Sequence, residues 1–131
     1  MRISFDHAHI FATNIDTTVD FFVRMFDAIV VWDEEAAGVR CARLMIGKGF
    51  VHVYAQPPRI LRTGVVHHLG IETDDLEGLV STMVSKGYVF RNPIREESKF
   101  KYVMIAGPDE LLIELFECRE PARWRLQDQS A

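Results

Sequence analysis

Residues 111–117, Leu-Leu-Ile-Glu-Leu-Phe-Glu, place one acid, Glu114, between apolar neighbours on both sides. A short apolar run of this kind is typical of a single buried β-strand. An ionised carboxylate in an apolar layer costs free energy unless a metal ion, a basic partner or a proton compensates its charge. Ordinary explanations for Glu114 are an edge-strand acid that faces water and an acid paired with a base, so the rest of the chain has to decide.

The segment before this strand completes a β-α-β-β-β unit. Asp74 with Glu77 resembles a capping box that opens a helix. Gly87 suits the end of that helix, because glycine readily adopts a left-handed backbone. The apolar positions at helical spacing are Leu76, Leu79, Val80, Met83 and Val84. The predicted strands are residues 65–72, 88–90, 100–106 and 111–117, with a turn at 107–109.

The first half of the chain predicts the same order of elements. Asp16 opens a helix that ends near Ala28, with an apolar face formed by Val19, Phe22, Val23 and Phe26. The predicted strands are residues 3–12, 29–32, 39–46 and 50–55, with turns at 34–38 and 47–49. Residues 56–64 contain Pro57-Pro58 and are interpreted as a linker, because proline cannot continue a strand ladder.

The two halves match by position. His68 lies 61 residues after His7, and the same offset relates the apolar helix positions. Glu114 lies 62 residues after His52. Such self-similarity indicates a duplicated unit that cannot close its own core and stacks on its copy. We therefore expect an α+β fold of two tandem βαβββ modules in one domain, with module one at about 3–56, a linker at 57–64, module two at about 65–117 and a tail at 118–131.

Size and composition exclude several classes of protein. The chain has 131 residues and a formal net charge of -4, with Lys and Arg scattered along it, so we expect no nucleic-acid partner. No apolar run approaches the roughly 20 residues that span a bilayer, so we expect no membrane partner. The N-terminus carries Arg2 and Asp6 and lacks a signal-peptide core, so a cytoplasmic location is expected. Cys41 and Cys118 have no Cys-x-x-Cys spacing and are assigned no chemistry.

Four matched side chains suggest a metal site. If the modules pair about a pseudo-twofold axis, corresponding strand positions converge there and bring together His7, His52, His68 and Glu114. Each histidine alone is more often an ordinary packed or solvated residue, but four at matched positions favour a metal. Nitrogen and oxygen donors suit divalent Fe, Mn, Co, Ni or Zn, and the absence of cysteine favours a catalytic ion over a structural one. His9, on the face of His7, would orient a ligand or simply line the cavity, and His67 would point to the opposite face from His68 and be packed or solvated.

The motifs of both halves resemble the vicinal oxygen chelate superfamily, the group of glyoxalases, bleomycin-resistance proteins and extradiol dioxygenases. The resemblance covers about residues 3–117 and rests on Asp6-His7, Asn14-Ile15, Asp20-Phe21-Phe22, His68-Leu69-Gly70-Ile71, Asp75-Leu76, Gly107-Pro108-Asp109 and Ile113-Glu114-Leu115. It implies a curved, cup-like mixed sheet with helices outside, a homodimer, and metal ligands from strands one and four of each module. Carried over by position, these ligands are His7, His52, His68 and Glu114.

The residue at position 52 separates the branches of this superfamily. Glyoxalase I enzymes usually have Glu there and methylmalonyl-CoA epimerases have Gln, so His52 departs from both. In extradiol dioxygenases His, His and Glu bind iron and a further histidine serves in acid-base catalysis, which His52 would match. Drug-binding resistance members have generally lost the ligands that this chain keeps. Phe11 stands where bacterial glyoxalase I presents an arginine, which disfavours glutathione as co-substrate.

The resemblance implies a lyase or isomerase of the glyoxalase or epimerase type, in which a divalent metal acidifies a C–H next to a carbonyl of a small chelating substrate. Glu114 would take the proton. Glu35, shortly before Gly38-Val39, resembles the second acid of the epimerases, whereas the ordinary explanation is a solvated turn acid. The alternatives are an Fe(II) extradiol-type dioxygenase and a binding or resistance protein without turnover. In the latter, an aromatic cup would hold the ligand through Phe50, Tyr54, Tyr102 and Phe116.

Overall fold

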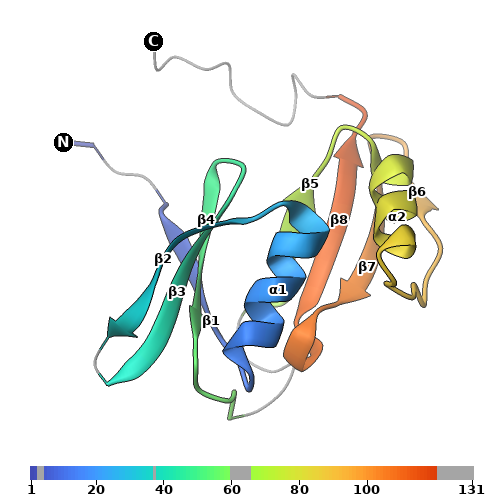
Figure 1. Cartoon of the computed structure of the whole chain (residues 1–131). Coiled ribbons are helices and arrows are strands. Elements are labelled where there is room, and N and C mark those ends of the chain that lie inside the picture. Colours follow the sequence, from blue (N-terminus) through green and yellow to red (C-terminus); the bar gives the residue numbers. More distant parts are fainter. Residues whose placement is uncertain (3–4, 37, 60–65, 121–131) are drawn as a thin grey trace. The chain divides into compact units, whose positions relative to one another are not determined.

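The computed structural model describes residues 1–2, 5–36, 38–59 and 66–120 (Figure 1). The chain divides into two compact units. Unit 1 contains the residues up to 63 together with Gly107–Leu111, and unit 2 contains the remainder. No helix of the described residues is long and apolar enough to cross a membrane.

Unit 1 contains a four-stranded mixed sheet and one α-helix. In chain order, the elements are β1 (His7–Phe11), α1 (Ile15–Phe26), β2 (Ile29–Ala36), β3 (Val39–Ile46) and β4 (Gly49–Tyr54). The strand order is β1-β4-β3-β2, with β1 parallel to β4 and the other pairs antiparallel. The 3-10 turn η1 (Pro108–Glu110) also belongs to unit 1, where the Asp109 carboxylate accepts a hydrogen bond of 3.0 Å from the backbone N–H of Thr13.

Unit 2 repeats this plan. Its elements are β5 (Leu69–Glu72), α2 (Leu76–Ser85), β6 (Arg95–Glu96), β7 (Phe100–Ala106) and β8 (Leu112–Cys118). The strand order β5-β8-β7-β6 matches that of unit 1, again with the first strand parallel to the last. The predicted α+β fold of two tandem βαβββ modules is confirmed.

The strand register reproduces the sequence offsets. Ala8 pairs with Val51 in unit 1, and Leu69 pairs with Ile113 in unit 2, which are the positions 61 and 62 residues later. On the other side of the last strand, Arg43 lies opposite His52 as Met104 lies opposite Glu114. His52 and Glu114 are therefore equivalent positions of the two sheets, as the sequence predicts.

Helix α1 begins one residue before the predicted start. The Asn14 side chain caps it by accepting a hydrogen bond of 3.1 Å from the N–H of Thr17. Its buried row is Ile15, Thr18, Phe22 and Met25. The predicted apolar face was correct for Phe22, whereas Val23 is 37% exposed. The buried row therefore lies to one side of the predicted face, and Val23 falls outside it.

Helix α2 is capped by Asp75 rather than by the predicted Asp74. The Asp75 carboxylate accepts from the N–H of Gly78 at 3.0 Å, and Glu77 pairs with Lys101 instead of closing a capping box. Leu76 and Met83 are buried, but Val84 of the predicted apolar face is 55% exposed. Gly87 adopts a φ of 97°, which confirms the left-handed residue predicted after this helix.

Several strand boundaries differ from the predictions, and β1 begins only at His7. β2 extends to Ala36, so Glu34 and Glu35 lie in a strand and not in a turn. Residues 88–90 form no strand; the hydroxyl of Tyr88 donates to the backbone oxygen of Ala106 at 3.0 Å, and the short strand of this region is β6. β5 begins at Leu69, so His67 and His68 precede the strand. Residues 60–64 of the predicted linker and the tail beyond residue 120 lie outside the described residues.

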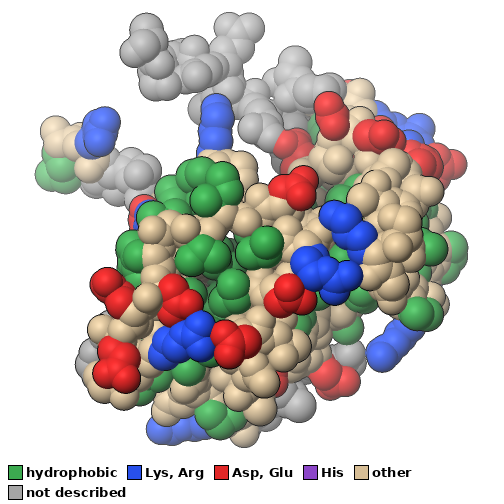
Figure 2. Space-filling view, in the orientation of Figure 1, with side chains coloured by type: hydrophobic (Ala, Val, Ile, Leu, Met, Phe, Trp, Pro, Cys, Tyr) green, Lys and Arg blue, Asp and Glu red, His purple; other side chains and the backbone are tan. Residues whose placement is uncertain are grey.

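Each sheet has one buried face and one open face. In unit 1, α1 packs on β3 and β4 over Leu44 and Val53, and in unit 2 α2 packs on β8, where Ile113 and Leu115 are fully buried. The face shown in Figure 2 carries Lys and Arg side chains beside Asp and Glu side chains rather than in one basic patch. Ion pairs join acidic and basic side chains within each unit: Arg24–Asp20, Arg40–Asp16, Arg40–Asp33, Lys101–Glu77 and Arg119–Glu96.

Candidate functional site

Two of the predicted ligands meet on the open face of unit 1. β1 is parallel to β4 and hydrogen-bonded to it, and His7 pairs with Phe50, two residues before His52 on the same face of β4. The rings of His7 and His52 stack with centroids 3.7 Å apart and planes 10° from parallel. His9 lies directly opposite His52 in the register, and its ring contacts Phe11 and Tyr54, which agrees with a cavity-lining residue.

Asp6 orients the His7 ring. Its Oδ2 lies 2.9 Å from His7 Nδ1, and it also receives two hydrogen bonds from Arg43, at 2.7 Å and 3.1 Å. These bonds, first that of Arg43 and then that of His7, hold the pKa of the Asp6 carboxyl well below its usual range. An ionised carboxylate only accepts, so His7 Nδ1 carries the proton and its Nε2 lone pair is left for a metal ion.

Arg43 also contacts His52. Its Nη1 lies 2.9 Å from His52 Nε2, and a guanidinium can only donate, so His52 Nε2 is the acceptor. Burial lowers the pKa of His52, and the charges of His7 and Arg43 lower it further. Arg43 is held from its other side by Phe50, whose ring centroid is 3.8 Å from the guanidinium carbon. His52 is thereby kept neutral, and its Nε2 would have to release Arg43 before binding a metal ion.

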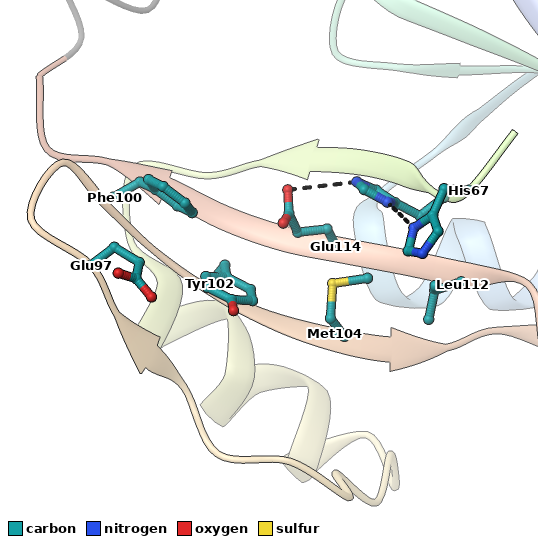
Figure 3. A pocket seen from close by; sticks show the side chains of 8 residues that line it. His67, Glu97, Phe100, Tyr102, Met104, Leu112 and Glu114 are labelled. Carbon is teal, nitrogen blue, oxygen red and sulfur yellow. Dashed lines mark hydrogen bonds and ion pairs between the residues drawn. The ribbon is translucent and has the colours of Figure 1, made fainter.

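The other two predicted ligands meet in unit 2 (Figure 3). His68 Nε2 lies 3.8 Å from Glu114 Oε1, with the two side chains 33% and 24% exposed. Two ligand atoms on one metal ion at 2.0–2.2 Å would be about 3 Å apart when adjacent and about 4 Å apart when opposite. The observed separation falls between these values, so this pair fits a shared divalent ion.

His67 is not where the sequence placed it. Strand alternation predicts that it points away from His68, but its Nδ1 lies 2.8 Å from His68 Nδ1, and both residues line the same pocket. The prediction was wrong because these residues precede β5, where the alternation of side chains no longer holds. His67 lies 61 residues after Asp6, and each of the two contacts the Nδ1 atom of the following histidine.

An open pocket of about 500 Å³ lies beside this pair, wholly within unit 2. Its lining residues are His67, His68, Glu97, Phe100, Tyr102, Met104, Leu112 and Glu114. Of the four predicted aromatic cup residues, Tyr102 lines this pocket and Phe116 does not; Phe50 and Tyr54 belong to the open face of unit 1. The alternation of Phe100, Tyr102 and Met104 in the sequence could have indicated this wall, whereas no sequence signal indicated Glu97.

Glu35 lies apart from the histidines of unit 1. It is exposed on β2, opposite Arg40 in the register, whereas the neighbour of His52 on β3 is Arg43. Side chains three positions apart on a strand point to opposite faces, so Glu35 points to the face that does not carry His52. A catalytic role for Glu35 stays a prediction.

The acidic groups of the described residues include a second cluster. Asp75, Glu77 and Glu117 bring carboxylate oxygens within 4.8 Å of one another. The ammonium group of Lys101 lies 2.7 Å from Glu77 and 3.5 Å from Glu117. Lys101 thus pairs with two of the three carboxylates, and the third, Asp75, caps α2, so we assign this cluster no ligand.

The chain belongs to the Glyoxalase/Bleomycin resistance protein/Dioxygenase superfamily, whose family model matches residues 4–115. The sequence resemblance to this group is therefore confirmed. No curated protein sequence matches the chain.

Several solved structures share the fold. A single-residue mutant of the fosfomycin resistance protein FosX from Listeria monocytogenes, complexed with Mn(II) and 1S,2S-dihydroxypropylphosphonic acid, has a TM-score of 0.76 at 13% identity, covering 94% of this chain and 98% of that one. A glyoxalase family protein from Enterococcus faecalis has a TM-score of 0.73 at 20% identity, covering 87% and 97%. TnmS3, an antibiotic-binding protein from Streptomyces sp. CB03234, has a TM-score of 0.74 at 16% identity, covering 90% and 98%. At these identities the likeness establishes the fold alone.

Proposed function

We propose that this protein is a divalent-metal-dependent lyase or isomerase of the glyoxalase or epimerase type, which moves a proton next to a carbonyl of a small chelating substrate. The observation that carries the proposal is the matched pairing of donors. His7 stacks on His52 in unit 1, and His68 faces Glu114 in unit 2, at equivalent positions of two copies of one fold. The proposal places both units in one domain, in which His7, His52, His68 and Glu114 hold one ion.

The donor chemistry supports such an ion. Three imidazoles and a carboxylate suit Ni, Zn, Co, Mn or Fe in the divalent state. If His68 binds the ion through Nε2, its Nδ1 carries the proton. That N–H donates a hydrogen bond to His67 Nδ1, just as His7 Nδ1 donates one to Asp6. FosX, which shares the fold, is a relative that binds Mn(II). A bound ion would polarise the oxygens of a chelating substrate and acidify the adjacent C–H.

Glu114 is the proposed base. Its carboxylate lies at the pocket, within reach of a substrate placed there, and no Lys or Arg forms an ion pair with it among the described residues. The His67–His68 bond keeps the His68 ring turned toward it. Proton abstraction by Glu114 would leave an enolate on the substrate. Glu35 is proposed as a second acid only on the family resemblance.

Metal binding tests the ligand set. Purified protein should contain close to one divalent ion per chain, measured by elemental analysis. H52A, H68A and E114Q should each weaken the Kd for Mn or Zn by more than about 100-fold, since losing even an outer-shell partner typically costs 10- to 100-fold. H9A is the matched control, because His9 lies on the same face as His7 and is not a proposed ligand. Wild-type protein that binds no ion, or variants that bind as wild type does, would refute the site.

Hydrogen exchange tests the reaction. In D₂O, a panel of small 2-hydroxy ketones and 2-oxo compounds should include one whose C–H beside the carbonyl exchanges in the presence of the protein. The exchange, followed by NMR, should stop on chelation, return with Ni, Co, Mn or Zn, and be absent with E114Q. Full exchange by metal-free protein would contradict the proposal.

One observation favours an Fe(II) extradiol-type dioxygenase as a second candidate. Arg43 occupies Nε2 of His52, which leaves His7, His68 and Glu114 as the metal ligands and His52 as an acid-base group. Oxygen consumption with catechols by anaerobically prepared Fe(II) protein would select this activity. A third candidate, small-molecule binding without turnover, is favoured by the open pocket of about 500 Å³ and by the likeness to TnmS3. Absence of stoichiometric metal would select it. The homodimer and the cytoplasmic location stay predictions.

A further inference from the structure

The pocket of unit 2 has a flat apolar wall. Phe100, Tyr102 and Met104 project from one face of β7, while Val103 and Ile105, which alternate with them, are buried on the other face. The rings of Phe100 and Tyr102 lie with centroids 5.6 Å apart and planes 33° from parallel. Their faces form a surface on which a second planar ring can stack.

Glu97 supplies a carboxylate at one end of this wall. Its backbone N–H donates to the Phe100 oxygen at 2.8 Å, which closes the turn between β6 and β7 and fixes the position of Glu97. Figure 3 shows Glu97 and Phe100 at one end of the pocket, His67 and Leu112 at the other, and Glu114 and Tyr102 between them. The Glu97 carboxylate forms no ion pair with a described residue, unlike Glu96, which binds Arg119 at 2.8 Å.

The charge of the lining is acidic. It contains the carboxylates Glu97 and Glu114 and two histidines, and no Lys or Arg among the described residues. The nearest basic residue by register is Arg95, which lies opposite Tyr102 on β6 but does not line the pocket. An aromatic wall beside an unpaired carboxylate favours cations, because ring faces and carboxylates both attract positive charge.

We propose that this pocket binds a ligand with an aromatic ring that stacks on Phe100 and Tyr102 and a cationic amine group that reaches Glu97. The proposal rests on the proposed function and assigns its substrate class: an aryl-alkyl amine, cationic at neutral pH, whose chelating oxygens lie at the His68 and Glu114 end of the pocket. It disfavours anionic substrates such as phosphonates and carboxylates, whose charge Glu97 would repel.

Three probes of one shape test the charge preference. Binding of 1-naphthylmethylamine, 1-naphthalenemethanol and 1-naphthoate is measured by ligand-observed NMR on metal-free protein and on protein loaded with Zn. The amine should bind about threefold to tenfold more tightly than the alcohol in both forms, the range given by one partly exposed carboxylate with cation–π support. Naphthoate that binds as tightly as the amine in metal-free protein would overturn the proposal.

Substitutions test whether Glu97 causes the preference for the amine and whether Tyr102 provides the stacking surface. E97Q should abolish the advantage of the amine over the alcohol, and E96Q, in the neighbouring carboxylate of the opposite face, should leave it unchanged. Y102L should weaken all three probes, whereas Y102F keeps the ring and should not. Glu97 lies in an exposed turn, so E97Q tests the proposal without disturbing the core. An amine preference that survives E97Q refutes the proposal.

The result separates this inference from the metal proposal. A wild-type protein that shows no amine preference but binds stoichiometric metal refutes the substrate class and leaves the metal site standing. An amine preference in a protein that binds no metal supports the pocket and refutes the metal-dependent reaction.

Discussion

The two units have the same strand order and register but carry different side chains on their open faces. Arg43 and His52 of unit 1 correspond to Met104 and Glu114 of unit 2. Unit 1 gathers hydrogen-bond donors and imidazoles around one carboxylate, whereas unit 2 gathers carboxylates beside aromatic rings. The comparison teaches that duplication preserved the backbone geometry while the open faces acquired separate tasks. In the proposed enzyme unit 1 contributes oriented imidazoles, and unit 2 contributes the base and the substrate pocket.

The largest expected effect concerns the cores, where the units should behave alike. Phe22 and Met83 are equivalent helix positions, and both are fully buried. F22A should lower the free energy of unfolding by about 3–5 kcal/mol and M83A by about 2–5 kcal/mol, because each leaves a cavity. Urea unfolding followed by circular dichroism measures both. V89A, at a side chain 80% exposed, should change it by less than about 0.5 kcal/mol. Losses below about 1 kcal/mol for both core variants would show that neither side chain is tightly packed, and a loss confined to one would show that the two positions are not equivalent.

A smaller effect is expected at the residues that orient the two histidines. D6N and H67N each replace the group that contacts Nδ1 of the following histidine. Each should weaken the Kd for Zn by about 10- to 100-fold while leaving the stoichiometry unchanged. D20N, which removes a surface partner of Arg24, should not change the Kd. If only one of the two variants weakens metal binding, Asp6 and His67 occupy matching positions but do not both orient a metal ligand.

Replacing Arg43 by the residue of unit 2 should alter the titration of His52. R43M removes a charge that lowers the pKa of His52, so that pKa should rise, as measured by NMR on metal-free protein. Neutral His52 must take up a proton on unfolding in acid, so its contribution to stability is complete above the ordinary pKa of 6.5 and is lost as the pH falls below it. The variant should lose less stability over this range. An unchanged or lower pKa would show that Arg43 does not keep His52 neutral.

The smallest effect concerns one polar atom in the core of unit 1. The hydroxyl of Thr18 is buried and has no hydrogen-bond partner among the described residues, whereas the equivalent residue of α2 is Leu79. T18V keeps the branched shape and removes the unsatisfied group, so it should raise the free energy of unfolding by about 1 kcal/mol. T18S is the control, because it retains the hydroxyl and should not stabilise. A loss of stability in T18V would indicate that water or another group satisfies this hydroxyl.

Much of the fold could be predicted from the sequence because it depends on local patterns and on their repetition. Alternation on β4 and the offset of 61 to 62 residues placed His52 and Glu114 at equivalent positions, and the strand register agrees. Helix caps were less certain, because Asp74 and Asp75 are adjacent residues of the same type and only the geometry of the backbone selects Asp75.

The surroundings of the site could not be predicted. The contacts of Arg43 join β3 to His52 on the neighbouring strand and to Asp6, which is 37 residues away, and a scattered arginine gives no local signal of its partners. The same holds for Glu97, which reaches the pocket only because the turn after β6 folds back on Phe100. Side-chain networks of this kind are set by tertiary packing, whereas strands and helices are set by periodicity.

The short segment Gly107–Leu111 lies between two strands of unit 2 and yet belongs to unit 1, where Asp109 binds the backbone of Thr13. A gene cut between residues 56 and 66 would therefore leave the first fragment without the segment whose Asp109 binds the backbone just before α1. The boundary between the two units therefore does not coincide with the boundary between the two sequence repeats, and a module-one fragment on its own would lack the contact between Asp109 and Thr13.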